Sequence, residues 1–311
     1  MMFKKAVLVN IKESDLDKSY WDKLDELVES KVFITRDDPK LKDELKECDC
    51  LLLGFQVDTQ KDIIDAAPNL AYIGVLATAY GTIDTEYAKS KNIPVCNLAG
   101  YSSEAVAEFT LAILLYQIRS LEEGINRGKS GNYDFAGMKA RELKDSKFGV
   151  IGLGSIGGRV AELAAGFGAN VSYWSRDKKS VPFTYQDLDT LMSTCDYISV
   201  NVAETPETTG LLNGDNLPKV KAGAVIISTV PPPVVETQAL ADRLAKGDIV
   251  FVSDHADEMP ENELDKLKQY KNCILLPAIA FITDEARQVK QEMFVGNIKA
   301  ALNKAPVNTV N

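Results

Sequence analysis

A glycine-rich segment at 152–157, Gly-Leu-Gly-Ser-Ile-Gly, limits the folds open to this chain more than any other feature. It follows the apolar run KFGVIG at 147–152 and leads into the amphipathic stretch GRVAELAAGFG at 158–168. A buried strand, a glycine turn and a helix in that order form the phosphate-binding part of a dinucleotide-binding βαβ unit. The alternative is a glycine-rich turn of the same kind without a ligand.

Each glycine of this segment has its own purpose in a dinucleotide site. Gly152 permits the tight turn, Gly154 lets the backbone approach a pyrophosphate, and Gly157 lets the helix lie close to the strand. The exposed N–H groups and the positive end of the helix dipole then hold the phosphates. We therefore expect the cofactor to contact Gly152, Gly154, Ser155, Ile156 and Gly157.

The strand after this helix, NVSYWS at 170–175, predicts which dinucleotide is bound. An NAD site places an acidic residue near the end of this strand, where it accepts a hydrogen bond from the ribose 2′-hydroxyl. Ser175 holds that position here, and Arg176 and Lys178 follow it. Because a guanidinium pairs with a 2′-phosphate and Asp177 can point outward from the turn, we expect NADP(H) in preference to NAD(H). A solvated basic turn is the alternative.

Apolar runs alternate with amphipathic stretches along nearly all of the 311 residues, which indicates parallel β-sheets flanked by helices. A chain of this length exceeds one compact core, so we expect two domains. The predicted buried strands are 5–11, 49–54, 72–78, 94–98, 147–152, 170–175, 197–201, 224–228, 249–254 and 273–279. Long helices are expected over 102–131 and 282–306.

Charge and composition exclude several classes of partner. The net charge of −10 repels nucleic acid and anionic lipid, and no apolar run approaches the ~20 residues that span a bilayer, so we expect neither nucleic acid nor a membrane as a partner. The first apolar run is expected to be a strand and not a signal peptide, which favours a cytoplasmic protein. His255 is the only histidine, which excludes a multi-histidine metal site.

The five cysteines are expected to be reduced thiols, because they form no CxxC pair and no ladder typical of disulfides. Cys48 and Cys50 flank one aspartate, and two interpretations of them are open. The two cysteines could bind a metal together, or they could lie where a helix ends before a buried strand, and the second interpretation is favoured. We therefore expect no metal.

Several segments together resemble the D-isomer-specific 2-hydroxyacid dehydrogenase family, nearest its hydroxypyruvate and glyoxylate reductase branch. They cover almost the full length of the chain: 72–115, 149–157, 204–213, 277–288 and 297–308. The resemblance implies an α/β fold in which a Rossmann doubly wound parallel sheet occupies residues 101–283. A smaller flavodoxin-like substrate domain is then expected from residues 1–100 and 284–311.

The resemblance also implies partners and a substrate loop. Members of the family are usually homodimers joined through the long helix after Tyr101, and they bind a dinucleotide together with a small-molecule ligand. The family's substrate loop corresponds to Ala77, Thr78 and Ala79, and its usual glycine is replaced by Ala79.

Three catalytic positions follow from the same resemblance. The family's arginine belongs to an N-T-A-R-G-G motif, where this chain has Ser228-Thr-Val-Pro-Pro-Pro233, so Pro231 takes its place. The family's glutamate lies five residues after the aspartate of a D-V-F-x-x-E-P motif; Asp254 begins the matching segment, so Met259 takes its place. The family's histidine follows the proline of a T-P-H-I motif, and Ala278 takes its place.

The remaining cofactor contacts are expected from Thr229, Val230 and Asp254. His255 and Tyr80 are the candidate substitutes for the lost acid. His255 should face away from the nicotinamide, because adjacent strand residues point to opposite faces, and Tyr80 is expected to pack. Glu258 lies one position before the family's glutamate and should point elsewhere.

Proline, methionine and alanine can neither donate a proton near neutral pH nor carry a positive charge. Reduction of a 2-keto acid needs both an acid and a cation. We therefore expect an NADP(H)-binding member of the family that lacks ordinary 2-keto acid reductase activity. The alternative is an active, divergent NAD(P)H-dependent oxidoreductase, which resembles the glyoxylate and hydroxypyruvate reductases or acts on a less polar carbonyl or an imine.

Overall fold

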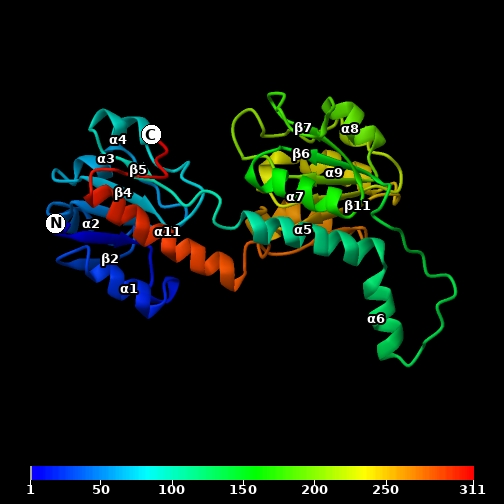
Figure 1. Cartoon of the computed structure of the whole chain (residues 1–311), viewed down its shortest axis with the longest axis horizontal. Coiled ribbons are helices and arrows are strands. Elements are labelled where there is room, and N and C mark those ends of the chain that lie inside the picture. The colour runs from blue at the N-terminus through cyan, green and yellow to red at the C-terminus, as the bar shows by residue number, and fades with distance from the viewer. Residues whose placement is uncertain (1) are drawn as a thin grey trace. The chain divides into compact units, whose positions relative to one another are not determined.

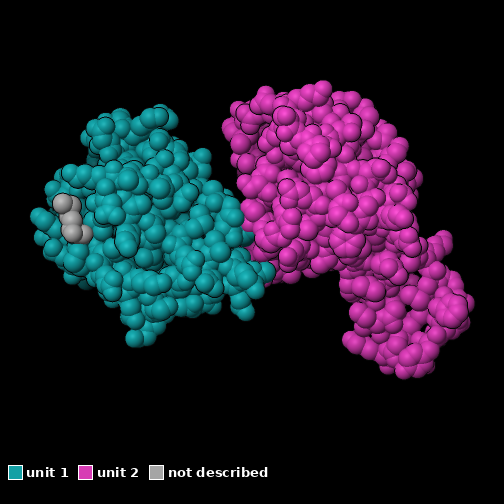
Figure 2. All heavy atoms as spheres, in the orientation of Figure 1, with its two compact units in different colours: residues 1–102, 283–311 teal, residues 103–282 magenta. Residues whose placement is uncertain are grey.

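The computed structural model describes residues 2–311. The chain forms two compact units, shown in different colours in Figure 2. Unit 1 consists of Met1–Ser102 and Thr283–Asn311, and unit 2 of Ser103–Ile282.

Unit 1 contains a parallel five-stranded sheet in the order β2-β1-β3-β4-β5, of which β2, β4 and β5 are labelled in Figure 1. This is the strand order of flavodoxin-like folds. The strands are β1 (Ala6–Val9), β2 (Lys31–Ile34), β3 (Cys50–Leu53), β4 (Tyr72–Val75) and β5 (Val95–Cys96). The helices are α1 (Lys18–Asp25), α2 (Leu41–Leu45), α3 (Lys61–Asp65), α4 (Thr85–Ser90) and α11 (Asp284–Leu302).

Two apolar layers hold unit 1 together, one on each face of its sheet. On one face, α1 and α11 pack against alternate strand residues such as Leu8 and Leu52. On the other face, α2, α3 and α4 pack against the intervening residues, such as Val7 and Leu51. The period of two in the strands therefore divides the core into these two layers.

Unit 2 contains a parallel seven-stranded sheet in the order β12-β11-β10-β9-β6-β7-β8. Counted from β6, this is the Rossmann strand order with one further strand. The strands are β6 (Lys147–Ile151), β7 (Asn170–Trp174), β8 (Thr184–Tyr185), β9 (Tyr197–Val200), β10 (Val225–Ser228), β11 (Val250–Ser253) and β12 (Cys273–Leu275). The predicted combination of a Rossmann sheet and a flavodoxin-like sheet is confirmed.

Helices cover both faces of the sheet in unit 2. Residues of α5 and α7 pack on one face, and residues of α8, α9 and α10 pack on the other. The helices of unit 2 are α5 (Ser103–Ile118), α6 (Leu121–Lys129), α7 (Ser155–Gly166), α8 (Leu188–Thr194), α9 (Thr237–Leu244) and α10 (Glu261–Lys268). Short 3₁₀ turns lie at η2 (Leu217–Lys219), η3 (Pro232–Val234) and η4 (Ala256–Glu258).

The helix expected over 102–131 is in fact two helices, so that prediction was wrong. The helix α5 ends at Ile118, and Ser120 has a φ of 51°, in the left-handed region, before α6 begins at Leu121. The strands β2 and β8 were not predicted. Their residues are partly buried or exposed, so they lack the continuous buried apolar pattern of the other strands.

Two further observations concern the chain as a whole. None of the helices within residues 2–311 is both long and apolar enough to cross a membrane. Each unit contains one of the chain's two tryptophans, Trp21 in α1 of unit 1 and Trp174 at the end of β7 in unit 2.

Candidate active site

The glycine-rich turn follows β6 and enters α7. Gly152 has a φ of 91°, and a Cβ atom there would lie 2.8 Å from the backbone nitrogen of Val202. A Cβ atom at Gly157 would lie 1.9 Å from the carbonyl oxygen of Gly152. Both positions therefore exclude any side chain, as the tight turn and the close approach of helix and strand require.

Gly154 is different, because a Cβ atom at this position would meet no atom within 4 Å. It is the residue that precedes α7, and no side chain caps this end of the helix. The backbone N–H groups of Ser155 and Ile156, the first two residues of α7, therefore have no side-chain acceptor. Open space lies beside Gly154. This arrangement fits a pyrophosphate bound at a helix N-terminus.

The segment after β7 lies against this turn. Gly152 donates its N–H to the carbonyl of Trp174 at 2.8 Å, and the Lys179 amino group donates to the carbonyl of Leu153 in the turn. Lys178, which we expected at the cofactor, lies with its Nζ atom 5.5 Å from the ring centroid of Tyr185. The sequence analysis missed the contact of Lys179 because adjacent lysines give no signal of which one points inward.

Ser175 and Arg176 differ in their exposure. Ser175 is buried, and its hydroxyl donates a hydrogen bond to the carbonyl of Asp177 at 2.6 Å. Arg176 is exposed. The pKa of Glu207 is lowered, mainly by a hydrogen bond with Thr205 and to a smaller degree by the positive charge of Arg176. The positive charge of Arg176 therefore contributes to the electrostatics of segment 204–213.

The proline run after β10 is a closed loop without a free carbonyl. The carbonyls of Pro231 and Pro232 accept hydrogen bonds from the N–H groups of Val234 and Val235, at 3.3 and 3.0 Å. The carbonyl of Pro233 accepts one from the N–H of Gly210 at 2.8 Å. Proline has no N–H, so these three residues present no backbone donor to a ligand. Of the two residues before them, Val230 is buried, and Thr229 lies with its hydroxyl oxygen 3.5 Å from the carbonyl of Val200.

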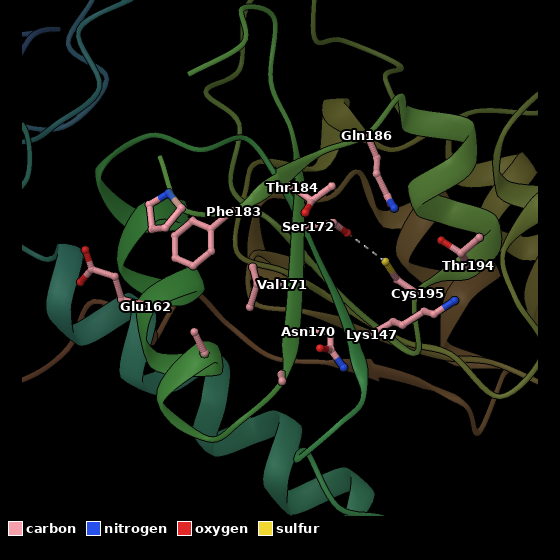
Figure 3. Close-up of a pocket in the computed structure, with 13 residues that line it drawn as sticks. Lys147, Glu162, Asn170, Val171, Ser172, Phe183, Thr184, Gln186, Thr194 and Cys195 are labelled. Carbon is pink, nitrogen blue, oxygen red and sulfur yellow. Dashed lines mark hydrogen bonds between the residues drawn. The ribbon is translucent and has the colours of Figure 1, made fainter. Parts of the chain in front are cut away.

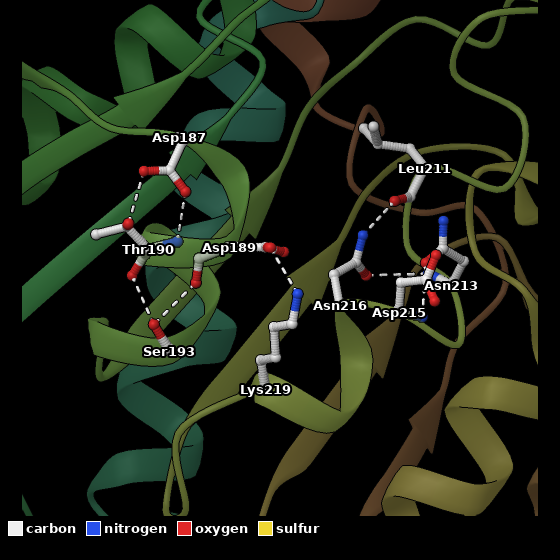
Figure 4. A network of polar contacts seen from close by, with 9 residues as sticks. All are labelled: Asp187, Asp189, Thr190, Ser193, Leu211, Asn213, Asp215, Asn216 and Lys219. Atoms are coloured by element: carbon white, nitrogen blue, oxygen red, sulfur yellow. Dashed lines mark hydrogen bonds and ion pairs between the residues drawn. The ribbon is translucent and has the colours of Figure 1, made fainter.

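Polar contacts hold the segment that supports this loop. Asn213 donates from its side-chain amide to the carbonyl of Gly210 at 3.0 Å, and its own N–H donates to the side chain of Asn216 at 3.0 Å. Figure 4 shows Asn216 bonded in turn to the carbonyl of Leu211, at 2.8 Å. In the same view, Lys219 reaches Asp189 of α8 at 2.6 Å. Hydrogen bonds and an ion pair therefore connect the proline loop, through segment 210–219, to the rest of unit 2.

Asp254 follows β11 and is almost fully buried, with 1% of its surface exposed. Its carboxylate accepts hydrogen bonds from the N–H groups of Ile279 and Ala280 at 3.1–3.2 Å. Burial raises the pKa of Asp254, and these two N–H groups oppose that shift. Asp254 thus fixes the backbone around Ala278, whose own N–H donates to Asp257 at 2.9 Å.

His255 and Glu258 are paired across the 3₁₀ turn η4. The Nδ1 atom of His255 lies 3.3 Å from Oε1 of Glu258, although it is buried and lacks the geometry of a hydrogen bond. Met259, in contrast, packs against the apolar core of unit 2. The sequence analysis did not anticipate the pair, because a turn of this kind brings residues three apart together only once its backbone conformation is known.

The expected substrate loop lies in unit 1, after β4. Its conformation is held by three hydrogen bonds: Leu98 N–H to the carbonyl of Ala77 at 3.0 Å, Thr78 hydroxyl to the carbonyl of Leu98 at 3.1 Å, and Asn97 amide to the carbonyl of Thr78 at 2.6 Å. Thr78 and Ala79 are exposed, and 38% of Tyr80 is exposed, so the expected packing of Tyr80 is only partial.

A cavity of about 750 Å³ in unit 2, shown in Figure 3, lies elsewhere. Its lining includes Lys147 and Asn170, which begin β6 and β7, together with Ser172, Gln186 and Cys195. In a parallel sheet the beginnings of the strands meet at the edge opposite to their ends. The cavity is therefore separate from the glycine-rich turn, which follows the end of β6.

The strand order and the glycine-rich turn define a dinucleotide-binding α/β protein. Residues 111–280 match the family model "D-isomer specific 2-hydroxyacid dehydrogenase, NAD binding domain". The hydroxypyruvate reductase of Blautia hydrogenotrophica is 30% identical over 262 residues, which cover 81% of this chain and 81% of that protein. The chain belongs to the D-isomer specific 2-hydroxyacid dehydrogenase family of oxidoreductases, as the sequence analysis predicted.

Two solved structures are similar over nearly their full length. The acyclic imino acid reductase in complex with NADPH and D-Arg has a TM-score of 0.86 and 25% identity, over 98% of this chain and 100% of that chain. The D-lactate dehydrogenase from Aquifex aeolicus complexed with NAD and lactic acid has a TM-score of 0.83 and 26% identity, over 97% and 99% of the two chains. The relatives thus include complexes with each of the two dinucleotides.

Proposed function

We propose that this protein binds NADP(H) in unit 2 and lacks ordinary 2-keto acid reductase activity. The observation that carries the proposal is the chemistry of the proline loop. Pro231 takes the family's arginine position in a run of three prolines that have no N–H and whose carbonyls are already bonded. These three residues offer neither a cation nor an amide to the substrate's carboxylate and carbonyl oxygens.

The other two family positions lead to the same proposal. Met259 packs into the core and Ala278 has no ionisable group, so neither supplies a proton to a developing alkoxide. A bound nicotinamide supplies the hydride. Keto acid reduction also requires a fixed positive charge and an acid. Pro231, Met259 and Ala278 supply neither.

The experiment is an absorbance assay of the full-length protein with NADPH and, separately, glyoxylate, hydroxypyruvate and pyruvate. We expect no turnover, together with NADPH binding in a calorimetric titration. Turnover at ordinary enzyme rates of roughly 1–10³ per second would contradict the proposed loss of activity. Absence of NADPH binding would contradict the proposed cofactor role.

The proposed preference for NADP(H) rests on Arg176 and on the absence of an acid at Ser175. Replacement of Arg176 by alanine should weaken NADPH binding at least tenfold more than NADH binding, because only NADPH carries the phosphate that the guanidinium pairs with. Lys246→Ala is the control, since Lys246 is an exposed lysine that precedes β11 and therefore lies at the opposite edge of the sheet. Equal losses of both dinucleotides in the Arg176 variant would exclude this phosphate contact.

A second candidate function is reduction of an imine, which the similarity to the acyclic imino acid reductase supports. A protonated imine already carries its proton and its positive charge. Hydride addition to its carbon gives a neutral amine, so no side chain has to donate a proton in that step. Oxidation of NADPH by pyruvate plus ammonium or arginine, but not by pyruvate alone, would distinguish this function from the first.

We also propose that the protein is a homodimer joined through α5, α6 and the loop that follows α6. In this part of unit 2, 84% of Tyr133 and 82% of Phe135 are exposed, and so are 46% of Leu121 and 46% of Ile125. Figure 1 shows α6 and the loop extending from the body of the unit. Aromatic side chains this exposed are typical of a surface that a partner covers.

A further inference from the structure

Unit 1 has a lysine where the packing of its last helix calls for an apolar residue. The helix α11 packs in the apolar layer on one face of the sheet with Phe294 and Ile298, which are buried and four residues apart. Ala286, eight residues before Phe294, is also buried. Lys290 occupies the position between Ala286 and Phe294 on the same stripe and is partly buried. Residues four apart share one face of a helix, so Lys290 belongs to the face that the sheet covers.

The positive charge of Lys290 has no close acidic partner. Within residues 2–311, no carboxylate lies within 4.0 Å of its amino group, whereas the neighbouring Arg287 pairs with Asp17 at 2.6 Å. The Nζ atom lies 6.0 Å from the ring centroid of Tyr101, at the outer limit of a cation–π contact. Burial lowers the pKa of Lys290, the charge of Arg287 lowers it further, and the charge of Asp15 opposes both.

Hydrogen bonds connect α11 to the expected substrate loop. Asn297 of α11 donates to the carbonyl of Asn97 at 3.0 Å, and Asn97 donates to the carbonyl of Thr78 at 2.6 Å. Tyr101 follows this segment and packs in the same apolar layer as Leu76, which precedes the loop. Lys290 and Tyr101 thus belong to the edge of unit 1 where its strands end, which is the edge at which open α/β sheets bind their ligands.

We propose that Lys290, held over Tyr101, is the positively charged group of a binding site in unit 1 for a small carboxylate ligand. The proposal rests on the proposed function, because a chain with Pro231 at the family's arginine position needs another cation to bind a carboxylate. An ammonium on the covered face of a helix attracts an anion more strongly than an exposed one, since less water screens it. The exposed loop at Thr78 and Ala79 would border the ligand.

The experiment measures oxalate and pyruvate binding to the full-length protein by calorimetry without cofactor. Lys290→Met removes the charge and keeps an apolar chain of similar length, and it should weaken binding at least tenfold. Lys290→Arg should stay within threefold of the wild type. The matched control is Lys23→Met, because Lys23 also lies over a tyrosine of unit 1, 4.3 Å from the Tyr20 ring centroid, and it should leave carboxylate binding unchanged.

Two further measurements separate this site from a packing role and from the cofactor site. The Lys290→Met variant should melt at or above the temperature of the wild type, which shows that it folds, and it should keep its NADPH affinity, which depends on unit 2. Equal oxalate affinity of wild type and Lys290→Met would overturn the proposal. So would the absence of carboxylate binding by the wild type at 10 mM ligand, about tenfold above the upper end of ordinary KM values. Turnover of keto acids alone would contradict the proposed function and not this site.

Discussion

Gly154 immediately precedes α7 and Gly157 is the third residue of that helix, yet their surroundings differ. At Gly157 an added methyl group would collide with the carbonyl of Gly152, so the requirement there is for folding. At Gly154 it would meet nothing of the protein. The fold therefore does not require glycine at 154, and the pyrophosphate that we propose to bind at this turn would account for it.

Gly154→Ala should consequently lose NADPH affinity at least tenfold with a free energy of unfolding unchanged to within ~0.5 kcal/mol. Gly158→Ala is the matched control, because a Cβ atom there also meets nothing within 4 Å. It lies inside α7, where alanine should raise the free energy of unfolding by up to about 1 kcal/mol. Calorimetric titration and urea unfolding measure both. Full affinity in the Gly154 variant would show that no pyrophosphate lies at this turn.

Lys290 predicts a dependence of stability on pH. Its pKa in the folded protein is lowered from the usual 10.5, so between the lowered value and 10.5 the unfolded chain binds the proton and the folded chain does not. The free energy of unfolding of the wild type should therefore rise with pH relative to that of Lys290→Met. Urea unfolding of both proteins between pH 7 and 10 tests this, and a constant difference would mean that Lys290 is solvated like an ordinary surface lysine.

At the scale of elements, the proline loop is stiff because of its own residues and because of its neighbours. Pro231 has a φ of −54°, and Pro232 begins a 3₁₀ turn, which is a conformation proline adopts without strain. The segment at Gly210 holds the end of the run. The loop is thus an ordered structural element whose conformational freedom is small even in the unfolded chain.

Replacing both Pro232 and Pro233 by glycine should lower the free energy of unfolding by about 1–2 kcal/mol, mostly because the unfolded chain gains conformations. The double alanine variant should lie between this variant and the wild type. Urea unfolding measures all three. If the double glycine variant is as stable as the wild type, the loop is strained in the folded protein and the bonded network does not hold it in a relaxed conformation.

The elements that the sequence predicted are those with a continuous buried pattern. Strands such as β1 and β9 are apolar on both faces, so their runs of valine, leucine and isoleucine identify them. The break at Ser120 could not be predicted, because the chain there has neither glycine nor proline. Two contacts also could not be predicted: that of Lys179 with the glycine-rich turn, and the pairing of His255 with Glu258. Both depend on the folded backbone and not on the spacing of residues in the sequence.

At the scale of the whole molecule, each unit is a complete α/β domain with its own sheet and its own apolar layers. The exposed aromatic side chains of the loop after α6 belong to neither core. Their exposure is unfavourable in an isolated chain, because each leaves most of a large apolar ring in water. A second copy that covers this loop would remove that unfavourable exposure.

The double variant Tyr133→Asp with Phe135→Asp should therefore be monomeric in sedimentation velocity, while the wild type sediments as a dimer. Two carboxylates in a covered apolar interface would lose their hydration without a partner. Phe55→Asp is the control in unit 1, where 54% of that ring is exposed, and it should remain dimeric. NADPH affinity should be unchanged in all three proteins. A monomeric wild type at micromolar concentration would rule out the proposed dimer.

The chain's two tryptophans, one in α1 of unit 1 and one at the end of β7 in unit 2, give each unit its own intrinsic fluorophore. Trp21 is 9% exposed, and its emission will report the burial of α1. Trp174 lies at the end of β7, in the strand next to the one that leads into the glycine-rich turn, so its emission will report changes within unit 2. If one tryptophan is replaced by phenylalanine at a time, fluorescence spectroscopy will follow the unfolding of each unit separately, without an attached label.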